Sequence, residues 1–232
     1  MAEGSDQEKT EPATPKKRQE ARRKGQVAKS REIPSVLVLL SALTVFYFAG
    51  SWMFGQLVMI TRSVLQQVNH HQMGIESAHA MMVYLFQNTV LLLSPMLVTV
   101  ALAGIIGNVS QVGFMLTGEV FQPKFSKLNP ISGMKRLFSL RGLIELIKSL
   151  IKVAIIGTIA YGVLRAEVDQ IPALVHLTTW NVLTFIGGVA LKMGYFTCVV
   201  LIVLAGVDYA FQRWQYERDL RMTKQEVKDE YK

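Results

Sequence analysis

Long apolar tracts set the pattern of this chain. Residues 33–61 and 77–118 contain no charged side chain, and residues 182–207 contain only Lys192. Each tract exceeds the roughly 20 mainly apolar residues that a helix needs to cross a bilayer. The pattern therefore predicts an integral membrane protein with several membrane-spanning helices.

A fourth apolar stretch is shorter. Residues 153–164 are uncharged for only 12 positions, so a spanning helix here has to include part of 145–152. Lys148 and Lys152 would then extend their ammonium groups toward the membrane surface. On this basis we expect an all-α membrane protein with four transmembrane helices, arranged as two hairpins joined by an amphipathic cytoplasmic loop.

The same pattern divides the chain into five segments. In order they are a basic amino-terminal segment at 1–32, a first transmembrane hairpin at 33–110, a loop at 111–144, a second hairpin at 145–207 and a linker at 208–232.

Capping residues predict two short helices in the polar segments. Thr14 is an N-cap followed by Pro15 at the first helical position, and Gly25 is a plausible stop, so a basic helix is expected between them. Thr223 and Glu226 have the spacing of a capping box, in which each side chain bonds the backbone N–H of the other residue. This predicts a second helix near the carboxyl end of the linker.

Basic residues gather in three of the five segments. Of 25 Lys and Arg, nine precede position 33, seven lie between 124 and 152, and six follow position 207, in a chain of net charge +8. The loops inside the two hairpins hold one each, Arg62 and Arg165. The positive-inside rule therefore predicts that both termini and the central loop are cytoplasmic.

The region 129–152 has too many charges for a span and too many apolar residues for a free loop. From Leu140 onward its apolar positions recur at spacings of three and four, which is typical of one face of a helix. Taken alone, this favours amphipathic helices on the cytoplasmic membrane surface, held by anionic lipid, over a surface that binds a protein partner.

Three separated sequences change that preference. They are EKTEPATPKKRQEARRKGQVAKSRE at 8–32, NPISGMKRLFSLRGLIELIKSLIK at 129–152 and RMTKQEVKDEYK at 221–232. In this order they resemble the FlhB family, the export-gate and substrate-switch components of flagellar and injectisome type III secretion. The resemblance implies a multi-pass protein of the bacterial inner membrane in the flagellar basal body.

The resemblance also implies partners and a site. It suggests that the central loop encircles the cytoplasmic mouth of the export-gate pore and contacts the pore-ring proteins, with exported flagellar substrates passing through and anionic lipid nearby. Because both hairpins would reach this loop while gripping the pore, the resemblance also implies that they sit apart and do not form a compact four-helix bundle. The candidate partner-binding residues in this loop are Pro130, Gly133, Lys135, Arg136, Leu137, Phe138, Arg141 and Gly142. Family members carry a soluble domain that cleaves itself at Asn-Pro-Thr-His, a sequence absent here. We therefore expect a transmembrane half without enzymatic activity.

Lys192 is the main isolated charge within a span, where a lysine costs about 2.5–3.5 kcal/mol on insertion scales. One interpretation is that backbone carbonyls or Tyr195 satisfy it. The other is an intramembrane ion pair or a contact with the gate, and the two are evenly balanced. Small-residue pairs such as Gly107 with Ala103 and Gly194 with Ala190 are interpreted as ordinary helix packing.

Other classes of function find little support in the sequence. His70 and His71 lack carboxylate or thiol companions, so neither a metal site nor another cofactor is expected. The basic amino-terminal segment contains no aromatic residue and six acidic ones, which argues against nucleic-acid binding. The alternative function is a small four-span transporter or channel subunit with its own pore, although its spans offer few paired polar residues to line a path.

Overall fold

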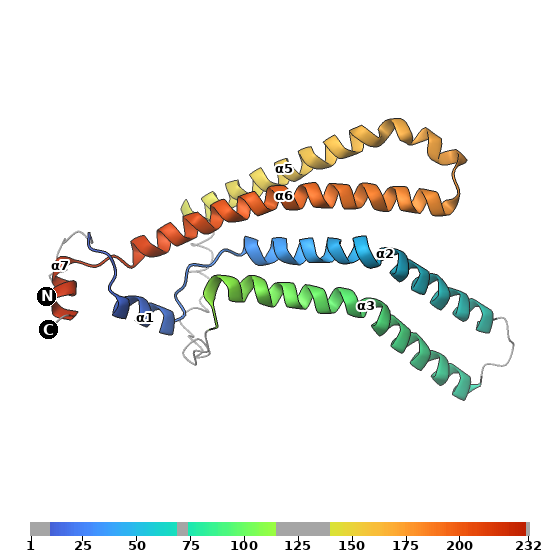
Figure 1. Cartoon of the computed structure of the whole chain (residues 1–232), viewed down its shortest axis with the longest axis horizontal. Coiled ribbons are helices and arrows are strands. Elements are labelled where there is room, and N and C mark those ends of the chain that lie inside the picture. Colours follow the sequence, from blue (N-terminus) through green and yellow to red (C-terminus); the bar gives the residue numbers. More distant parts are fainter. Residues whose placement is uncertain (1–9, 69–73, 115–139, 231–232) are drawn as a thin grey trace. The chain divides into compact units, whose positions relative to one another are not determined.

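The computed structural model describes residues 10–68, 74–114 and 140–230 (Figure 1). These ranges are helical and contain no β-strand, apart from one isolated bridge between Glu11 and Met222. The predicted all-α class is therefore confirmed for the described part of the chain.

Four long helices carry most of the described residues. They are α2 (Glu32–Val68), α3 (Ile75–Val112), α5 (Leu140–Glu167) and α6 (Thr179–Asp219). Shorter helices precede, connect or follow them, namely α1 (Pro15–Arg23), η3 (Val168–Gln170), η4 (Pro172–His176) and α7 (Lys224–Glu230).

Within the described ranges, three helices are long and apolar enough to cross a membrane: α2, α3 and α6. Helix α5 is not among them, so the structure shows three candidate spans and not the four predicted. Glu145, Lys148 and Lys152 interrupt the amino-terminal half of α5. The uncharged remainder falls short of the roughly 20 residues that a bilayer requires.

The chain folds as two compact units. Unit 1 comprises Met1–Ile33, Asn108–Thr158 and Val203–Lys232, and unit 2 comprises Pro34–Gly107 and Ile159–Ile202. Unit 1 thus brings together the amino-terminal segment, the end of α3, the charged half of α5 and the end of α6. Unit 2 contains most of the apolar length of α2, α3 and α6.

In unit 2 the helices α2 and α3 pack closely at one position. A Cβ atom added at Gly107 of α3 would lie 2.9 Å from the Cα of Pro34 and 3.2 Å from Leu37 Cδ1 of α2. Glycine removes the side chain that would otherwise hold two backbones apart. Gly107 therefore sets the distance between these two helices.

Helix α2 also packs against α6 in unit 2. A Cβ added at Gly194 would lie 2.7 Å from Leu43 Cδ2, and the rings of Tyr47 and Tyr195 meet edge to face with centroids 6.4 Å apart. The expectation that the two hairpins sit apart was therefore wrong. Glycine at position 194 permits the close approach to Leu43, and the edge-to-face tyrosine pair adds a second contact between the two helices.

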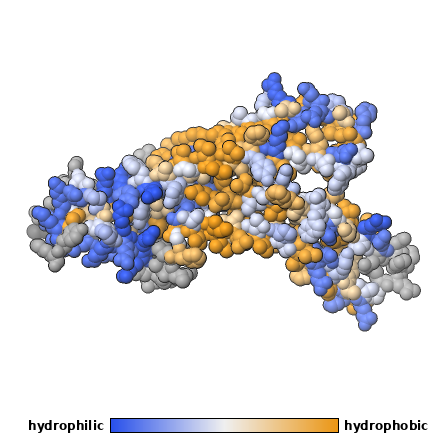
Figure 2. Space-filling model, in the orientation of Figure 1, coloured by the Kyte–Doolittle hydropathy of each residue, from blue (hydrophilic) through white to orange (hydrophobic). Residues whose placement is uncertain are grey.

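Most apolar side chains of these helices face outward. In the most apolar stretches of α2, α3 and α6, only 6%, 6% and 17% of residues are buried. Figure 2 shows hydrophobic residues over the middle of the long helices and hydrophilic residues toward their ends. A surface of this kind has to be covered by lipid or by other proteins.

The two capped helices form as predicted. The Thr14 side chain accepts a hydrogen bond from the Lys17 N–H at 3.2 Å, and Gly25 follows α1 with a φ of 73°. The Thr223 N–H donates to Glu226 Oε2 and the Glu226 N–H donates to Thr223 Oγ1, each at 3.2 Å. Both predictions are confirmed, because capping depends on residues a few positions apart.

Candidate functional site

Most of the predicted partner-binding residues lie outside the described part of the chain. This applies to Pro130, Gly133, Lys135, Arg136, Leu137 and Phe138. Arg141 and Gly142 belong to the first turn of α5, where Gly142 is half-buried. The role of all eight residues in partner binding stays a prediction.

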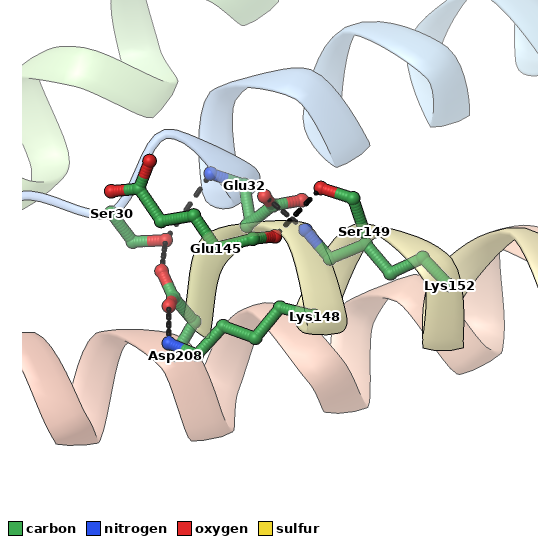
Figure 3. A network of polar contacts seen from close by, with 7 residues as sticks. All are labelled: Ser30, Glu32, Glu145, Lys148, Ser149, Lys152 and Asp208. Atoms are coloured by element: carbon green, nitrogen blue, oxygen red, sulfur yellow. Dashed lines mark hydrogen bonds and ion pairs between the residues drawn. The ribbon is translucent and has the colours of Figure 1, made fainter. Parts of the chain in front are cut away.

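The described residues of unit 1 contain a second candidate site. Four chain segments meet there through a cluster of polar side chains that we call the polar junction, consisting of Ser30, Glu32, Lys148, Lys152 and Asp208 (Figure 3). Ser30 precedes α2, and Glu32 is its first residue. The two lysines lie four positions apart on α5, hence on one face of the helix, and Asp208 lies on α6.

One carboxylate organises this junction. Asp208 Oδ2 accepts a hydrogen bond from the Ser30 hydroxyl at 2.7 Å, while Oδ1 lies 3.2 Å from the Lys148 ammonium. The Asp208 side chain is 19% exposed, and the Lys148 ammonium also lies 4.8 Å from the centre of the Phe211 ring. Asp208 therefore holds both the amino-terminal segment and α5 against α6.

Ser30 is fully buried, and its backbone N–H and its hydroxyl both form hydrogen bonds. Its backbone N–H donates to Gln111 Oε1 at 2.8 Å, and its hydroxyl oxygen accepts from the Glu32 N–H at 3.2 Å while the hydroxyl donates to Asp208. A buried polar group left without partners costs about 1–3 kcal/mol. Ser30 thus caps α2 and joins it to the ends of α3 and α6.

Glu32 and Lys152 complete the junction as an ion pair between α2 and α5. Their side chains are 30% and 24% exposed, and the pair is accompanied by the Lys148–Asp208 pair one turn away. The sequence alone predicted neither of these carboxylate partners. Each is neutralised by a carboxylate from another helix, so the four charges of the junction cancel.

Sequence reasoning missed the acidic half of this junction. Glu32 was counted within the basic amino-terminal segment and Asp208 within the linker. Each residue directly adjoins a long apolar tract, and Lys148 and Lys152 adjoin a third. That shared position at the edge of apolar tracts is the signal that identifies the partners.

Next to the junction, the amino-terminal segment pairs with the linker. The backbones of Glu11 and Met222 exchange two hydrogen bonds of 3.0 and 2.9 Å. The guanidinium of Arg18 forms two bonds of 2.8 Å with the carboxylate of Glu217. We call the contact of residues 11–18 with residues 217–230 the terminal clasp.

A third contact secures the clasp at α7. The Thr14 hydroxyl donates to Glu230 Oε2 at 2.6 Å while also capping α1. Bidentate arginine–carboxylate pairs have a fixed geometry, and backbone bonds fix the register of the two segments. The terminal clasp therefore defines how the linker leaves α6.

Lys192 lies in unit 2 and pairs with an acidic residue. Its ammonium is 2.7 Å from Glu167 Oε1, where the Glu167 side chain is 14% exposed and that of Lys192 is 48% exposed. Tyr195 instead meets Tyr47. Of the two interpretations of Lys192, the structure shows the ion pair, and sequence reasoning missed Glu167 because it lies 25 positions away.

The hydrogen bonds and ion pairs of the polar junction and the terminal clasp hold separate segments of the chain together. In the ranges 10–68, 74–114 and 140–230, no group of three or more His, Cys, Asp or Glu side chains is placed to hold a metal ion. Cys198 is buried. The charged groups of the junction pair within the junction, and Arg18 of the clasp pairs with Glu217. The arrangement joins the amino-terminal segment, parts of the four long helices and the linker in one unit.

Comparison with known proteins covers nearly the whole chain. A model of the "FlhB HrpN YscU SpaS Family" matches residues 7–232. The chain is 39% identical to the flagellar biosynthetic protein FlhB of Bacillus subtilis over 225 residues, which cover 97% of this chain and 62% of that protein.

Two more distant relatives agree. Identity is 35% over 238 residues with the Yop proteins translocation protein U of Yersinia pestis, covering 97% of this chain and 63% of that one. It is 31% over 237 residues with FlhB of Salmonella typhimurium, covering 100% and 61%. The chain thus spans a little over three fifths of the length of these relatives.

Proposed function

Because the chain belongs to the FlhB HrpN YscU SpaS family of type III secretion export components, we propose that it wraps the pore of a flagellar export gate. In this role its helices lie against the pore-ring membrane proteins, and its linker joins them to the domain that switches substrate specificity. Exported flagellar proteins pass through the gate beside it.

The outward-facing apolar surface is the observation that carries this proposal. Residues such as Phe48 and Val199 are 78% and 61% exposed on α2 and α6. A transporter with its own path buries its helices against one another, whereas a wrapping subunit leaves them free for lipid on one side and protein on the other. The low burial of α2, α3 and α6 supports the second arrangement.

The terminal clasp supports the connection to the switch domain. Arg18 and Glu217, with the Glu11–Met222 backbone pair, hold the linker beside the amino-terminal segment. If a domain attached to this linker moved, the contacts of the clasp would therefore change first and those of the polar junction next. Through Glu32 and Asp208 it would reach α2 and α6.

The proposed topology has both ends of the chain in the cytoplasm of a bacterial cell, which requires an even number of crossings of the inner membrane. Because α2, α3 and α6 alone would place the ends on opposite sides, the proposal includes α5, a helix of 28 residues, as a further crossing. The basic residues concentrated before position 33 and after position 207 support this orientation. So does the clasp, because a direct contact of residues 11–18 with residues 217–230 requires both segments on one side of the membrane.

The central loop is proposed to contact the mouth of the pore. Replacing Leu137 and Phe138 by alanine removes apolar area worth about 3 kcal/mol, while the apolar face of α5 continues to anchor the region in lipid. Gly133 and Gly142 are proposed to allow the bends that a curved rim requires. Secretion should fall in these variants while insertion into the membrane stays normal.

The test combines secretion with cross-linking in cells that contain the complete gate. A photoreactive amino acid at Phe48 or Val199 should form adducts with pore-ring proteins, and the Leu137→Ala/Phe138→Ala variant should co-purify less of them. A matched variant with Ile171→Ala and Val175→Ala, which changes exposed residues of the connection between α5 and α6, controls for lost apolar area. Normal secretion in the loop variant would refute the role of the loop, and solute transport by the purified chain in liposomes would favour the alternative function.

A further inference from the structure

A cleft of about 520 Å³ lies in unit 1 beside the terminal clasp. It is bounded by α1, by the segment that follows α1, by the end of α3 and by residues 209–217 of α6. The residues that line it include Val27, Val112, Tyr209, Arg22 and Arg213. A volume of this size accommodates a small molecule or a lipid headgroup.

The charges of this cleft are unbalanced. Arg18 also lines it, but both ends of its guanidinium are bound to Glu217. Among the residues that the structure describes, no carboxylate forms an ion pair with Arg22 or Arg213. The cleft thus presents two guanidinium groups from different helices, and such groups bind phosphate oxygens in a bidentate manner.

The position of the cleft on α6 matches the depth of lipid headgroups. The apolar tract of α6 ends at Val207, and Arg213 follows it by six residues, about 9 Å along a helix. Four aromatic residues lie in the same short stretch, Tyr209, Phe211, Trp214 and Tyr216. Tyr and Trp concentrate where the hydrocarbon core meets the headgroups.

We infer that this cleft binds the phosphate of an anionic phospholipid headgroup between Arg22 and Arg213, with the glycerol portion against Val27 and Val112. Binding would connect α1 to α6 through the lipid, next to the Arg18–Glu217 pair that already joins them. The inference requires only that the chain is embedded in a bilayer, and it is independent of the proposed role at the export gate.

The test measures lipid binding to the purified full chain in mild detergent, with short-chain phosphatidylglycerol as the probe and phosphatidylcholine as the neutral comparison. Arg22→Gln and Arg213→Gln should each weaken phosphatidylglycerol binding about tenfold, since each removes a charge-assisted bond. Arg23→Gln and Arg221→Gln remove the same charge from exposed arginines outside the cleft. These controls should change binding less than about twofold.

Three outcomes would overturn the inference. Equal losses in the cleft and control variants would mean a general attraction to positive charge. Inorganic phosphate that competes as strongly as the lipid would mean a site for free phosphate. Equal binding of phosphatidylcholine and phosphatidylglycerol would mean that the arginines do not recognise the anionic headgroup.

Discussion

The hydroxyl of Ser30 and the carboxylate of Asp208 form a hydrogen bond of 2.7 Å although 178 positions separate them in the sequence. Ser30 is fully buried at the start of α2, and Asp208 lies where the apolar tract of α6 ends. Because the same carboxylate also binds Lys148, this contact is the centre of unit 1. Its loss should loosen the amino-terminal segment, α5 and α6 together.

Ser30→Ala should lower the free energy of unfolding by about 1–2 kcal/mol, because it removes both the α2 cap and the donor to Asp208. Thermal unfolding of the purified chain in detergent, followed by tryptophan fluorescence, measures the effect. Ser149→Ala is the matched control, since its hydroxyl bonds only the Glu145 carbonyl of its own helix. Equal effects of the two substitutions would contradict a central role for Ser30.

Lys192 and Glu167 should behave as a coupled pair. Lys192→Met leaves a largely covered carboxylate without its cation, so we expect less protein in the membrane and a lower unfolding temperature. The double variant Lys192→Met/Glu167→Gln should recover most of the loss, with a coupling energy on the order of 1–2 kcal/mol. Strictly additive losses in unfolding free energy would show that the pair contributes little.

Three glycines of the long helices should differ in their tolerance of alanine. Gly107→Ala should destabilise most, by about 1–3 kcal/mol, because its Cβ would meet the Pro34 backbone at 2.9 Å, which no side-chain rotation relieves. Gly194→Ala should cost less, since it meets the movable end of Leu43. Gly188→Ala enters open space and should be close to neutral.

Unfolding in detergent ranks these three variants. The order Gly107, Gly194, Gly188 is specific to the observed helix pairs, because all three residues lie in helices and propensity alone would make every alanine equally favourable. A Gly107→Ala variant as stable as Gly188→Ala would mean that α2 and α3 do not approach each other as described.

An engineered disulfide should cross-link the two segments of the terminal clasp. Residues that exchange two backbone hydrogen bonds across an antiparallel bridge have Cα atoms about 5.5 Å apart, which suits a disulfide. We expect Glu11→Cys and Met222→Cys together, in a Cys198→Ser background, to cross-link under mild oxidation in native membranes. Altered gel mobility that reductant reverses reports the bond, and each single-cysteine variant is the control. Absence of cross-linking would mean that the clasp does not form in the membrane.

Features that depend on neighbouring residues were predictable from the sequence. The apolar tracts predicted α2, α3 and α6, and the capping residues Thr14 and Thr223 predicted where α1 and α7 begin. These properties follow from side chains within a few turns of one another, so one sequence contains the necessary information. The family resemblance rests on the order of three sequences and likewise needs no structure.

Contacts between distant segments were decided only by the tertiary structure. The sequence placed Lys152 beside an apolar tract but could not say that Glu32 neutralises it, and it left Lys192 between two interpretations. Nor did small-residue spacing show that Gly194 is the position at which α2 approaches α6. The physical reason is that burial, pairing and close approach depend on which helix lies opposite, and that choice is made only when the whole chain packs.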